Sequence, residues 1–345
     1  MKDEKILLVG EDIFEVYAKA FLDSYQKLGY QNVTFFAINH YMNGKGSVGK
    51  LLMRIQNKFS CGYSVKKVNK KLLDTVKDDT PELVFFYTTR QIYPKVIKKI
   101  KDMGCKVFMY NNDNPFAPYF PKYFWRHYIG GLRYADYGFV YRHSNVEDYK
   151  KRGCKNVEVL KSYYIADRNF YIEKPQMTVP EVVFIGHHEP DEREDYIQGL
   201  LNIGVHVGVM RKGWEDFETE NPLLAKLDDS HKYYNEMLNA TKIALVFLSK
   251  INHDTYTRRC FEIPATRTLM VAPYTEEIAS MFEDGKEVVL YHNKQEFVEK
   301  VQYYLEHEEE RIQIANAGYQ RLMRDGHEVG DRIKQVMEAY TRVRG

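Results

Sequence analysis

The sequence predicts an α/β fold built from two doubly wound parallel sheets, one in each half of the chain. Short apolar runs alternate with amphipathic helical stretches through both halves, which is the pattern of a parallel sheet covered by helices on both faces. With 345 residues, the chain is too long for one ordinary hydrophobic core and suits two domains. Hydrophobic residues make up 44% of it, which excludes a disordered or fibrous protein.

The first half begins with a strand, a glycine turn and a helix. The apolar run ILLVG ends at Gly10, and Phe14, Ala18 and Phe21 then recur at helical spacing. Further strands are expected in PELVFFYTT, CKVFMYNND, YGFVYRHS and NVEVLKSYY, with helical stretches after the first and third of these. We expect these elements to form a first Rossmann-like domain over residues 1–170.

The second half repeats this plan. A polar stretch at residues 168–180, RNFYIEKPQMTVP, contains two prolines and is the predicted linker. Strand, glycine turn and helix then return in EVVFIGHHEPDEREDYIQGLLNIG. Later strands are expected in VHVGVM, KIALVFLS, TLMVAPY and EVVLY, and a helix near FEIPAT. This predicts a second Rossmann-like domain over residues 178–325 and a helix over 326–345 that packs back on the first domain.

The composition excludes several classes of protein. A formal net charge of +2 argues against a protein whose main task is to bind nucleic acid. No apolar run approaches the roughly 20 residues needed to cross a bilayer. The cysteines form no C-x-x-C pair, and the first residues, MKDEKILLVGED, do not read as a signal peptide. We therefore expect a reduced, cytoplasmic protein without a structural zinc site.

The glycine turns argue against two common nucleotide-binding classes. The turns at Gly10 and Gly186 lack the G-x-G-x-x-G pattern, and G-x-x-x-x-G-K-[ST] occurs nowhere in the chain. Dinucleotide oxidoreductases and P-loop enzymes are therefore disfavoured. Doubly wound sheets bind ligands beyond the carboxyl ends of their strands, and two such sheets facing a cleft suit a transfer between two substrates.

The stretch DTYTRRCFEIPATRTLMVAPYTEEI, residues 254–278, carries the most specific signal. Its R-x-F-E-I-P-A string from Arg259 to Ala265, together with Glu276 and Glu277, resembles the group 1 glycosyltransferases. The resemblance is greatest to their CgeB-like branch, which is associated with spore maturation and cell-surface proteins. It implies a GT-B fold, with a sugar nucleotide bound in the second domain and the acceptor on the side of the first.

Two acids stand at the positions that such relatives use for the donor. Asp254 and Glu262 are separated by seven residues, with Asp in place of the usual Glu. A carboxylate such as Glu262 can accept hydrogen bonds from both hydroxyls of a ribose. The alternatives are a helix-dipole role for Glu262 and an N-cap role for Asp254.

Positive charge surrounds these acids. The turn at residues 256–258 opens a helix whose free N–H groups favour a diphosphate. Arg193 and Arg259 would add bidentate contacts to that leaving group. For Arg193, the alternative is an ion pair with Asp191 or Glu194. The chain has no Asp-x-Asp element, so we expect chemistry that needs no metal.

Two loops in the second half complete the predicted donor site. His187 follows a strand and would contact phosphate or sugar, unless it is an exposed loop histidine. The RKGWEDF loop, residues 211–217, would hold the base with Trp214 stacking on it, unless that ring packs beneath the loop. The predicted contacts to the sugar nucleotide are Gly186, His187, Lys212, Trp214, Tyr256, Thr257, Arg258 and Glu262.

In the first half, YNNDNPF places Asp113 at a strand end, where its carboxylate would orient an acceptor hydroxyl. An Asx-rich turn before Pro115 explains the same letters without function. Arg90 holds an equivalent position one strand earlier. The residues assigned to catalysis are Asp113, Arg193, Asp254 and Arg259.

The segment from Lys45 to Lys71 has eight basic residues and no acidic one, with Leu51, Leu52 and Ile55 at helical spacing. Such a segment is consistent with peripheral contact to an anionic membrane and a lipid-linked acceptor. The alternative is a solvated helix whose apolar side joins the core.

These observations together predict a cytoplasmic hexosyltransferase, working in part at the inner face of the membrane. It would move a sugar from a UDP-, GDP- or dTDP-sugar to a cell-surface glycan, a lipid-linked acceptor or a protein, without a further cofactor. Retention of the anomeric configuration is implied by the resemblance. The rival hypotheses are a nucleotide-sugar epimerase or phosphorylase on the same fold, and a non-catalytic component of a spore or cell surface.

Overall fold

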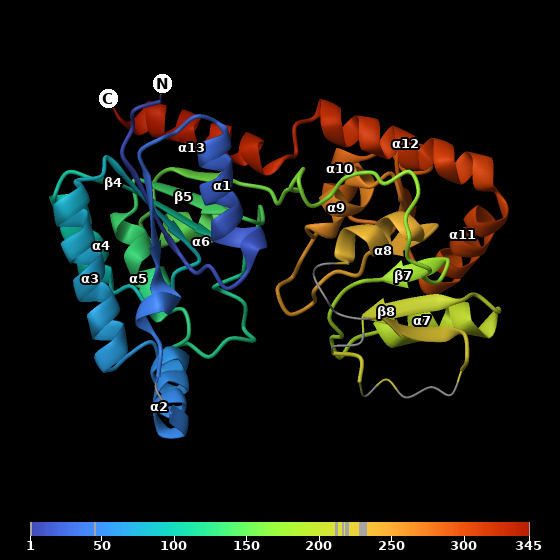
Figure 1. Ribbon diagram of the computed structural model, residues 1–345, viewed down its shortest axis with the longest axis horizontal. Helices are drawn as coiled ribbons and strands as arrows, with labels where there is room; N and C mark the ends of the chain where they lie inside the picture. Colours follow the sequence, from blue (N-terminus) through green and yellow to red (C-terminus); the bar gives the residue numbers. More distant parts are fainter. Residues whose placement is uncertain are drawn as a thin grey trace. The chain divides into compact units, whose positions relative to one another are not determined.

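The computed structural model describes residues 2–44, 46–210, 213–215, 217, 221–227 and 233–344. Within these residues the chain forms two six-stranded sheets in which every neighbouring pair of strands is parallel. Unit 1 comprises Met1–Ser162 and Val329–Gly345, and unit 2 comprises Tyr163–Glu328 (Figure 1). The predicted fold class, two doubly wound α/β domains, is confirmed.

The sheet of unit 1 has the strand order β2-β1-β3-β4-β5-β6. Its strands are β1 (Ile6–Gly10), β2 (Val33–Ala37), β3 (Leu83–Tyr87), β4 (Lys106–Asn111), β5 (Tyr137–Val140) and β6 (Val157–Val159). The central strands are buried on both faces, as their unbroken apolar runs predict.

Helices cover both faces of this sheet (Figure 1). They are η1 (Glu15–Lys19), α1 (Ala20–Lys27), η2 (Ile38–Tyr41), α2 (Gly46–Phe59), α3 (Tyr63–Asp79), α4 (Pro94–Asp102), α5 (Arg126–Gly131), η3 (Leu132–Tyr134), α6 (Asn145–Lys151) and α13 (Val329–Arg344). Helix α13 packs against α1, and its Tyr340 ring meets Phe108 of β4 edge-on at 6.4 Å. The last helix therefore belongs to the first unit, although it follows the second in sequence.

The sheet of unit 2 has the order β12-β11-β10-β7-β8-β9. Its strands are β7 (Val182–Phe184), β8 (Val207–Met210), β9 (Leu224–Leu227), β10 (Ile243–Leu245), β11 (Leu269–Pro273) and β12 (Val289–Tyr291). Its helices are α7 (Arg193–Asn202), α8 (Tyr234–Ala240), α9 (Arg259–Ala265), α10 (Glu276–Met281), α11 (Lys294–Glu306) and α12 (Glu308–Arg324). Helix α7 packs on α11, and α9 packs on α12.

Several boundaries differ from the predicted ones. The chain divides between Ser162 and Tyr163, ahead of the polar stretch 168–180. That stretch is bound to α8, since the backbone N–H of Phe170 donates to Asn235 Oδ1 at 3.1 Å and that of Ile172 to Asn239 Oδ1 at 2.6 Å. Strands β2 and β9 were not predicted, and both lie at a sheet edge. No helix in the described part of the chain is both long and apolar enough to span a bilayer.

Candidate functional site

A pocket of about 420 Å³ lies at the carboxyl ends of the strands in unit 2. Because all six strands are parallel, the loops after β7 and β10 and the last residues of β11 and β12 meet at one edge of the sheet. The lining residues are Asp191, Glu192, Arg193, Tyr196, Phe247, Leu248, Ser249, Lys250, His253, Asp254, Pro273 and Tyr291. Two of the predicted catalytic residues, Arg193 and Asp254, therefore share one pocket.

Arg193, at the start of α7, is fixed by an ion pair that sequence analysis left as an alternative. Its Nε and Nη2 donate to the two carboxylate oxygens of Asp191, each at 2.7 Å, and its Nη1 donates to the carbonyl of His187 at 2.6 Å. Although burial of Asp191 opposes its charge, the hydrogen bonds and charge of Arg193 hold the pKa of Asp191 below its ordinary value. With these donors occupied, Arg193 is suited to position the loop.

Arg259 also lies at the end of β7. Its Nε donates to the carbonyl of Ile185 at 2.6 Å, and its guanidinium lies 5.6 Å from the ring of Phe184, which Arg193 also approaches at 5.8 Å. A methyl group at Gly186 would lie 2.9 Å from Arg259 Nη2, so the absent side chain of this glycine makes room for the guanidinium. Within the described residues, Nη1 and Nη2 of Arg259 have no hydrogen-bond partner.

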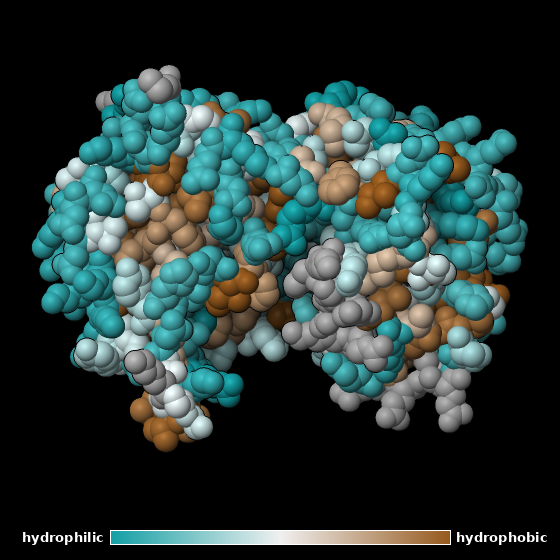
Figure 2. Space-filling view, viewed as in Figure 1, coloured by the Kyte–Doolittle hydropathy of each residue, from teal (hydrophilic) through white to brown (hydrophobic). Residues whose placement is uncertain are grey.

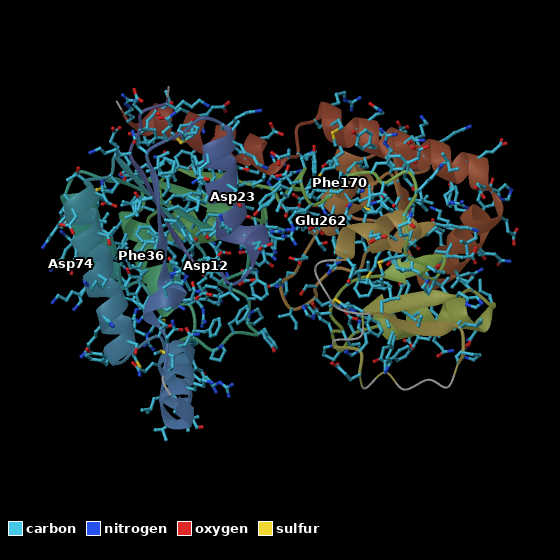
Figure 3. All side chains as sticks on the ribbon, in the orientation of Figure 1. Asp12, Asp23, Phe36, Asp74, Phe170 and Glu262 are labelled. Atoms are coloured by element: carbon cyan, nitrogen blue, oxygen red, sulfur yellow. The ribbon has the colours of Figure 1, made fainter. Side chains whose placement is uncertain are left out.

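Glu262 is held by a residue that sequence analysis did not identify. Its Oε2 accepts a hydrogen bond from the hydroxyl of Tyr234 on α8 at 2.7 Å. Glu262, which is labelled in Figure 3, is only 8% exposed. Burial, and then the charge of Glu262, raise the pKa of Tyr234 well above its ordinary value, while Arg259 and Arg258 oppose this shift. Glu262, Arg259 and Arg258 therefore all influence the pKa of the Tyr234 hydroxyl. Neither Glu262 nor Arg259 lines the 420 Å³ pocket that contains Asp254.

The head of α9 does not offer the free N–H groups that were predicted. The helix has seven residues, and the backbone N–H groups of Cys260, Phe261 and Glu262 bond to carbonyls of residues 257 and 258. The N–H of Arg259 donates to Thr257 Oγ1 at 3.1 Å. These donors are used within the protein, so an anion here would be held by side chains. The N-cap alternative for Asp254 fails too, because Arg258 is the N-cap of α9.

Other predicted contact residues divide into core and surface. Trp214 is fully buried, and its Nε1 donates to the carbonyl of Gly186 at 2.9 Å, so this ring cannot stack on a base. Tyr256 is also fully buried and packs edge-on against Phe261. His187 is exposed, and Arg258 lies 4.8 Å over the ring of Tyr163. Lys212 lies outside the described residues.

Unit 1 has a pocket of its own, of about 310 Å³, at the carboxyl ends of β1, β3 and β4. Its lining residues are Glu11, Phe14, Tyr17, Tyr87, Thr88, Arg90, Asn112, Asp113, Phe120, Phe124 and Trp125. Arg90 lies 4.0 Å over the ring of Phe124, and its Nη1 is buried and has no hydrogen-bond partner among the residues that the structure describes. A buried donor of this kind is costly unless a ligand or water satisfies it.

Asp113 belongs to this pocket, as its strand-end position predicted. Burial raises the pKa of Asp113 above its ordinary value, and the charges of Arg142 and Arg90 reduce this shift without cancelling it. Burial likewise raises the pKa of Glu11 on the same pocket. Two carboxyl groups with raised pKa values beside a desolvated guanidinium are typical of a functional site.

The shifted pKa of Asp113 predicts a pH-dependent effect on stability. The Asp113 carboxyl group binds a proton more tightly in the folded protein than in the unfolded chain. The free energy of unfolding therefore falls as the pH rises from the ordinary pKa of aspartate through the raised pKa of Asp113. Asp113→Asn cannot ionise and should therefore melt at a higher temperature than the wild type at neutral pH, with the difference disappearing in acid. Melting curves across pH test this, and a variant less stable at neutral pH would contradict it.

No group of three or more His, Cys, Asp and Glu side chains suited to a metal ion occurs within the described residues. The four cysteines are free, and three of them are buried.

Comparison with known proteins supplies the activity class. A protein family described as glycosyl transferase-like matches residues 192–338. A search of curated proteins finds no match. Among solved structures, sucrose-phosphate synthase from Thermosynechococcus elongatus is 10% identical, with 99% of both chains covered and a TM-score of 0.74. HepE from Anabaena, solved with UDP and glucose, is 12% identical, with 98% of this chain and 100% of that chain covered and a TM-score of 0.69.

A glycosyltransferase from Rickettsia africae is 10% identical, with 99% of both chains covered and a TM-score of 0.69. At such identities the solved structures establish the fold, and the family match over residues 192–338 supports the resemblance to group 1 enzymes. The CgeB-like branch stays a prediction. The chain therefore has the GT-B fold, and the family match over residues 192–338 indicates a glycosyltransferase.

Proposed function

We propose that the protein transfers a hexose-type sugar from a nucleoside diphosphate to a cell-surface glycan, a lipid-linked acceptor or a protein, with retention of configuration and without a metal. The observation that supports the donor class best is the cluster of Glu262, Arg259 and Tyr234 in unit 2. HepE, which has the same fold, was solved with UDP and glucose and with UDP-glucose.

The donor would be held by Glu262 and Arg259. Since Tyr234 occupies only Oε2, the Oε1 of Glu262 is left to accept hydrogen bonds from ribose hydroxyls. The Nη1 and Nη2 groups of Arg259 form a fork that suits a diphosphate. Asp254 would reach the sugar from the neighbouring pocket, and Arg193 would keep the β7 loop in place for both.

The chemistry would rest on stabilisation of the leaving group. As the bond between sugar and diphosphate breaks, negative charge gathers on the diphosphate, and a donor already aimed at it lowers the barrier by an amount on the order of 3 kcal/mol. In a retaining reaction, the departing diphosphate can take the proton from the acceptor hydroxyl on the same face. No separate carboxylate base is then required.

The acceptor would bind in the pocket of unit 1. Its aromatic rings offer flat apolar surfaces to a sugar ring, and Asp113 and Glu11 offer hydrogen-bond acceptors. Arg90 offers Nη1, a donor that no described residue occupies. Asp113 would orient the acceptor hydroxyl.

A nucleotide panel tests the donor site. We expect one of UDP, GDP, dTDP and CDP to raise the melting temperature of the protein clearly above the shifts given by the others. Glu262→Gln keeps an oxygen that can accept the hydrogen bond from Tyr234. It should lower the affinity for that nucleotide about 10-fold to 100-fold, because a hydrogen bond to a charged group contributes about 1.5–3 kcal/mol.

The matched control is Glu299→Gln, an exposed glutamate on α11, which should bind nucleotide as the wild type does. Failure of every nucleotide to stabilise the protein would favour a non-catalytic surface component. Turnover of a sugar nucleotide to its epimer without an acceptor would favour the epimerase instead.

A further inference from the structure

Helix α2 presents its apolar side to solvent. None of its residues is buried, and Figure 2 shows hydrophobic surface at its end. The apolar side chains follow helical spacing and form one strip, the α2 strip: Val48 is 72% exposed, Leu51 57%, Leu52 52%, Ile55 46% and Phe59 38%. A surface helix of a globular protein ordinarily turns such a strip toward the core.

Polar side chains beside and opposite the α2 strip tie the helix to the rest of unit 1. Gln56 Oε1 accepts a hydrogen bond from the backbone N–H of Ser64 at 2.8 Å, and Asn57 Oδ1 accepts one from Gln91 Nε2 at 2.9 Å. These polar contacts fix the rotation of the helix about its axis. The outward direction of the α2 strip is therefore set by hydrogen bonds.

Basic side chains lie along one border of the strip and on the neighbouring helices α3 and α4. Lys50, Arg54 and Lys58 follow one another along one border of α2, and α3 adds four exposed lysines, Lys66, Lys67, Lys70 and Lys71. Between α3 and α4, Lys66 and Lys70 share a groove of about 220 Å³ with Lys95 and Lys99. None of these basic groups has an acidic partner in the described part of the chain.

We propose that unit 1 docks on the surface of an anionic lipid bilayer, with the α2 strip in the boundary between head groups and acyl chains and the lysines of α2, α3 and α4 on the head groups. Charge complementarity selects this occupant, because residues 45–71 contain eight basic residues and no acidic one. An aliphatic strip beside a basic border is the pattern of a helix lying in a membrane interface. This goes beyond the proposed function, since it holds whether or not the chain transfers a sugar.

Co-sedimentation of the full chain with vesicles tests the proposal. We expect binding to vesicles of phosphatidylcholine with phosphatidylglycerol, little binding to phosphatidylcholine alone, and release by salt. The variant Leu51→Ser/Leu52→Ser/Ile55→Ser should bind at least about 10-fold more weakly, because each side chain loses apolar contact with the membrane interface. Its melting temperature should not change, since these side chains are exposed.

The matched control is Ile312→Ser, an exposed isoleucine on α12 of unit 2, which should bind vesicles as the wild type does. A second variant, Lys66→Gln/Lys70→Gln, should bind anionic vesicles more weakly while keeping the strip intact.

Wild-type protein that does not sediment with anionic vesicles would overturn the proposal, as would a triple-serine variant that binds normally. Self-association that the triple-serine variant loses, without vesicle binding, would assign the strip to a second copy. A missing nucleotide shift would leave vesicle binding unaffected, so the two proposals fail separately.

Discussion

Arg259→Met should lower kcat for sugar transfer by about 100-fold or more, because it removes a pre-aimed donor to the departing diphosphate. The Nε of Arg259 already bonds to the Ile185 carbonyl, so the side chain is fixed before a donor arrives. This orientation is what makes Nη1 and Nη2 effective in the transition state. The measurement is steady-state transfer or slow donor hydrolysis with the nucleotide sugar that the panel identifies.

Two further variants sharpen this test. Gly186→Ala would place a methyl group 2.9 Å from Arg259 Nη2 and 2.5 Å from Phe184 Cζ, so it should displace the guanidinium and lower kcat as well. Arg324→Met removes a 63% exposed arginine of α12 and should leave kcat unchanged. If Arg259→Met keeps kcat within a few-fold of the wild type, the guanidinium is structural and the diphosphate is held elsewhere.

Asp191→Ala should lower the free energy of unfolding by about 3–5 kcal/mol, because it leaves the charge of Arg193 buried without its bidentate partner. The side chains of the pair are 4% and 9% exposed, so the charge of Arg193 is largely withdrawn from solvent. Glu189 lies 3.5 Å from Arg193 Nη2 and is too distant to restore both hydrogen bonds. Denaturant unfolding of the protein without ligand measures the loss.

The control comes from the same pocket. Lys250 and Glu192 form an ion pair of the same length, 2.7 Å, but their side chains are 63% and 66% exposed. Glu192→Ala should therefore change stability by about 1 kcal/mol or less. Equal effects of Asp191→Ala and Glu192→Ala would show that burial does not govern the strength of the Arg193 pair.

Some features of this protein are local in sequence and could be predicted from it. The buried strands β1, β3, β4, β7 and β11 each carry an unbroken apolar run, which has few other structural explanations. Edge strands β2 and β9 lack this signal, because they have one neighbour and stay partly exposed. The partner of Arg193 stands two residues away, and it was among the alternatives for that reason.

Other features depend on residues that meet only in the folded chain. Tyr234, which binds Glu262, stands 28 residues before it, and nothing in the local pattern of either residue indicates the pair. The sequence around Trp214 is compatible with a ring that stacks on a base and with a ring that packs in the core, and only its complete burial in the fold distinguishes the two.

The sequence by itself determined two parallel sheets, the strand ends at which the pockets lie, and the helical spacing of the α2 strip, since each follows from the period of apolar residues along the chain. Only the tertiary structure decided which way that strip points, which oxygen of Glu262 stays available, and that the N–H groups at the head of α9 are occupied. The physical reason is that periodicity assigns a residue to a face of its element, whereas hydrogen bonds between distant segments decide what that face meets.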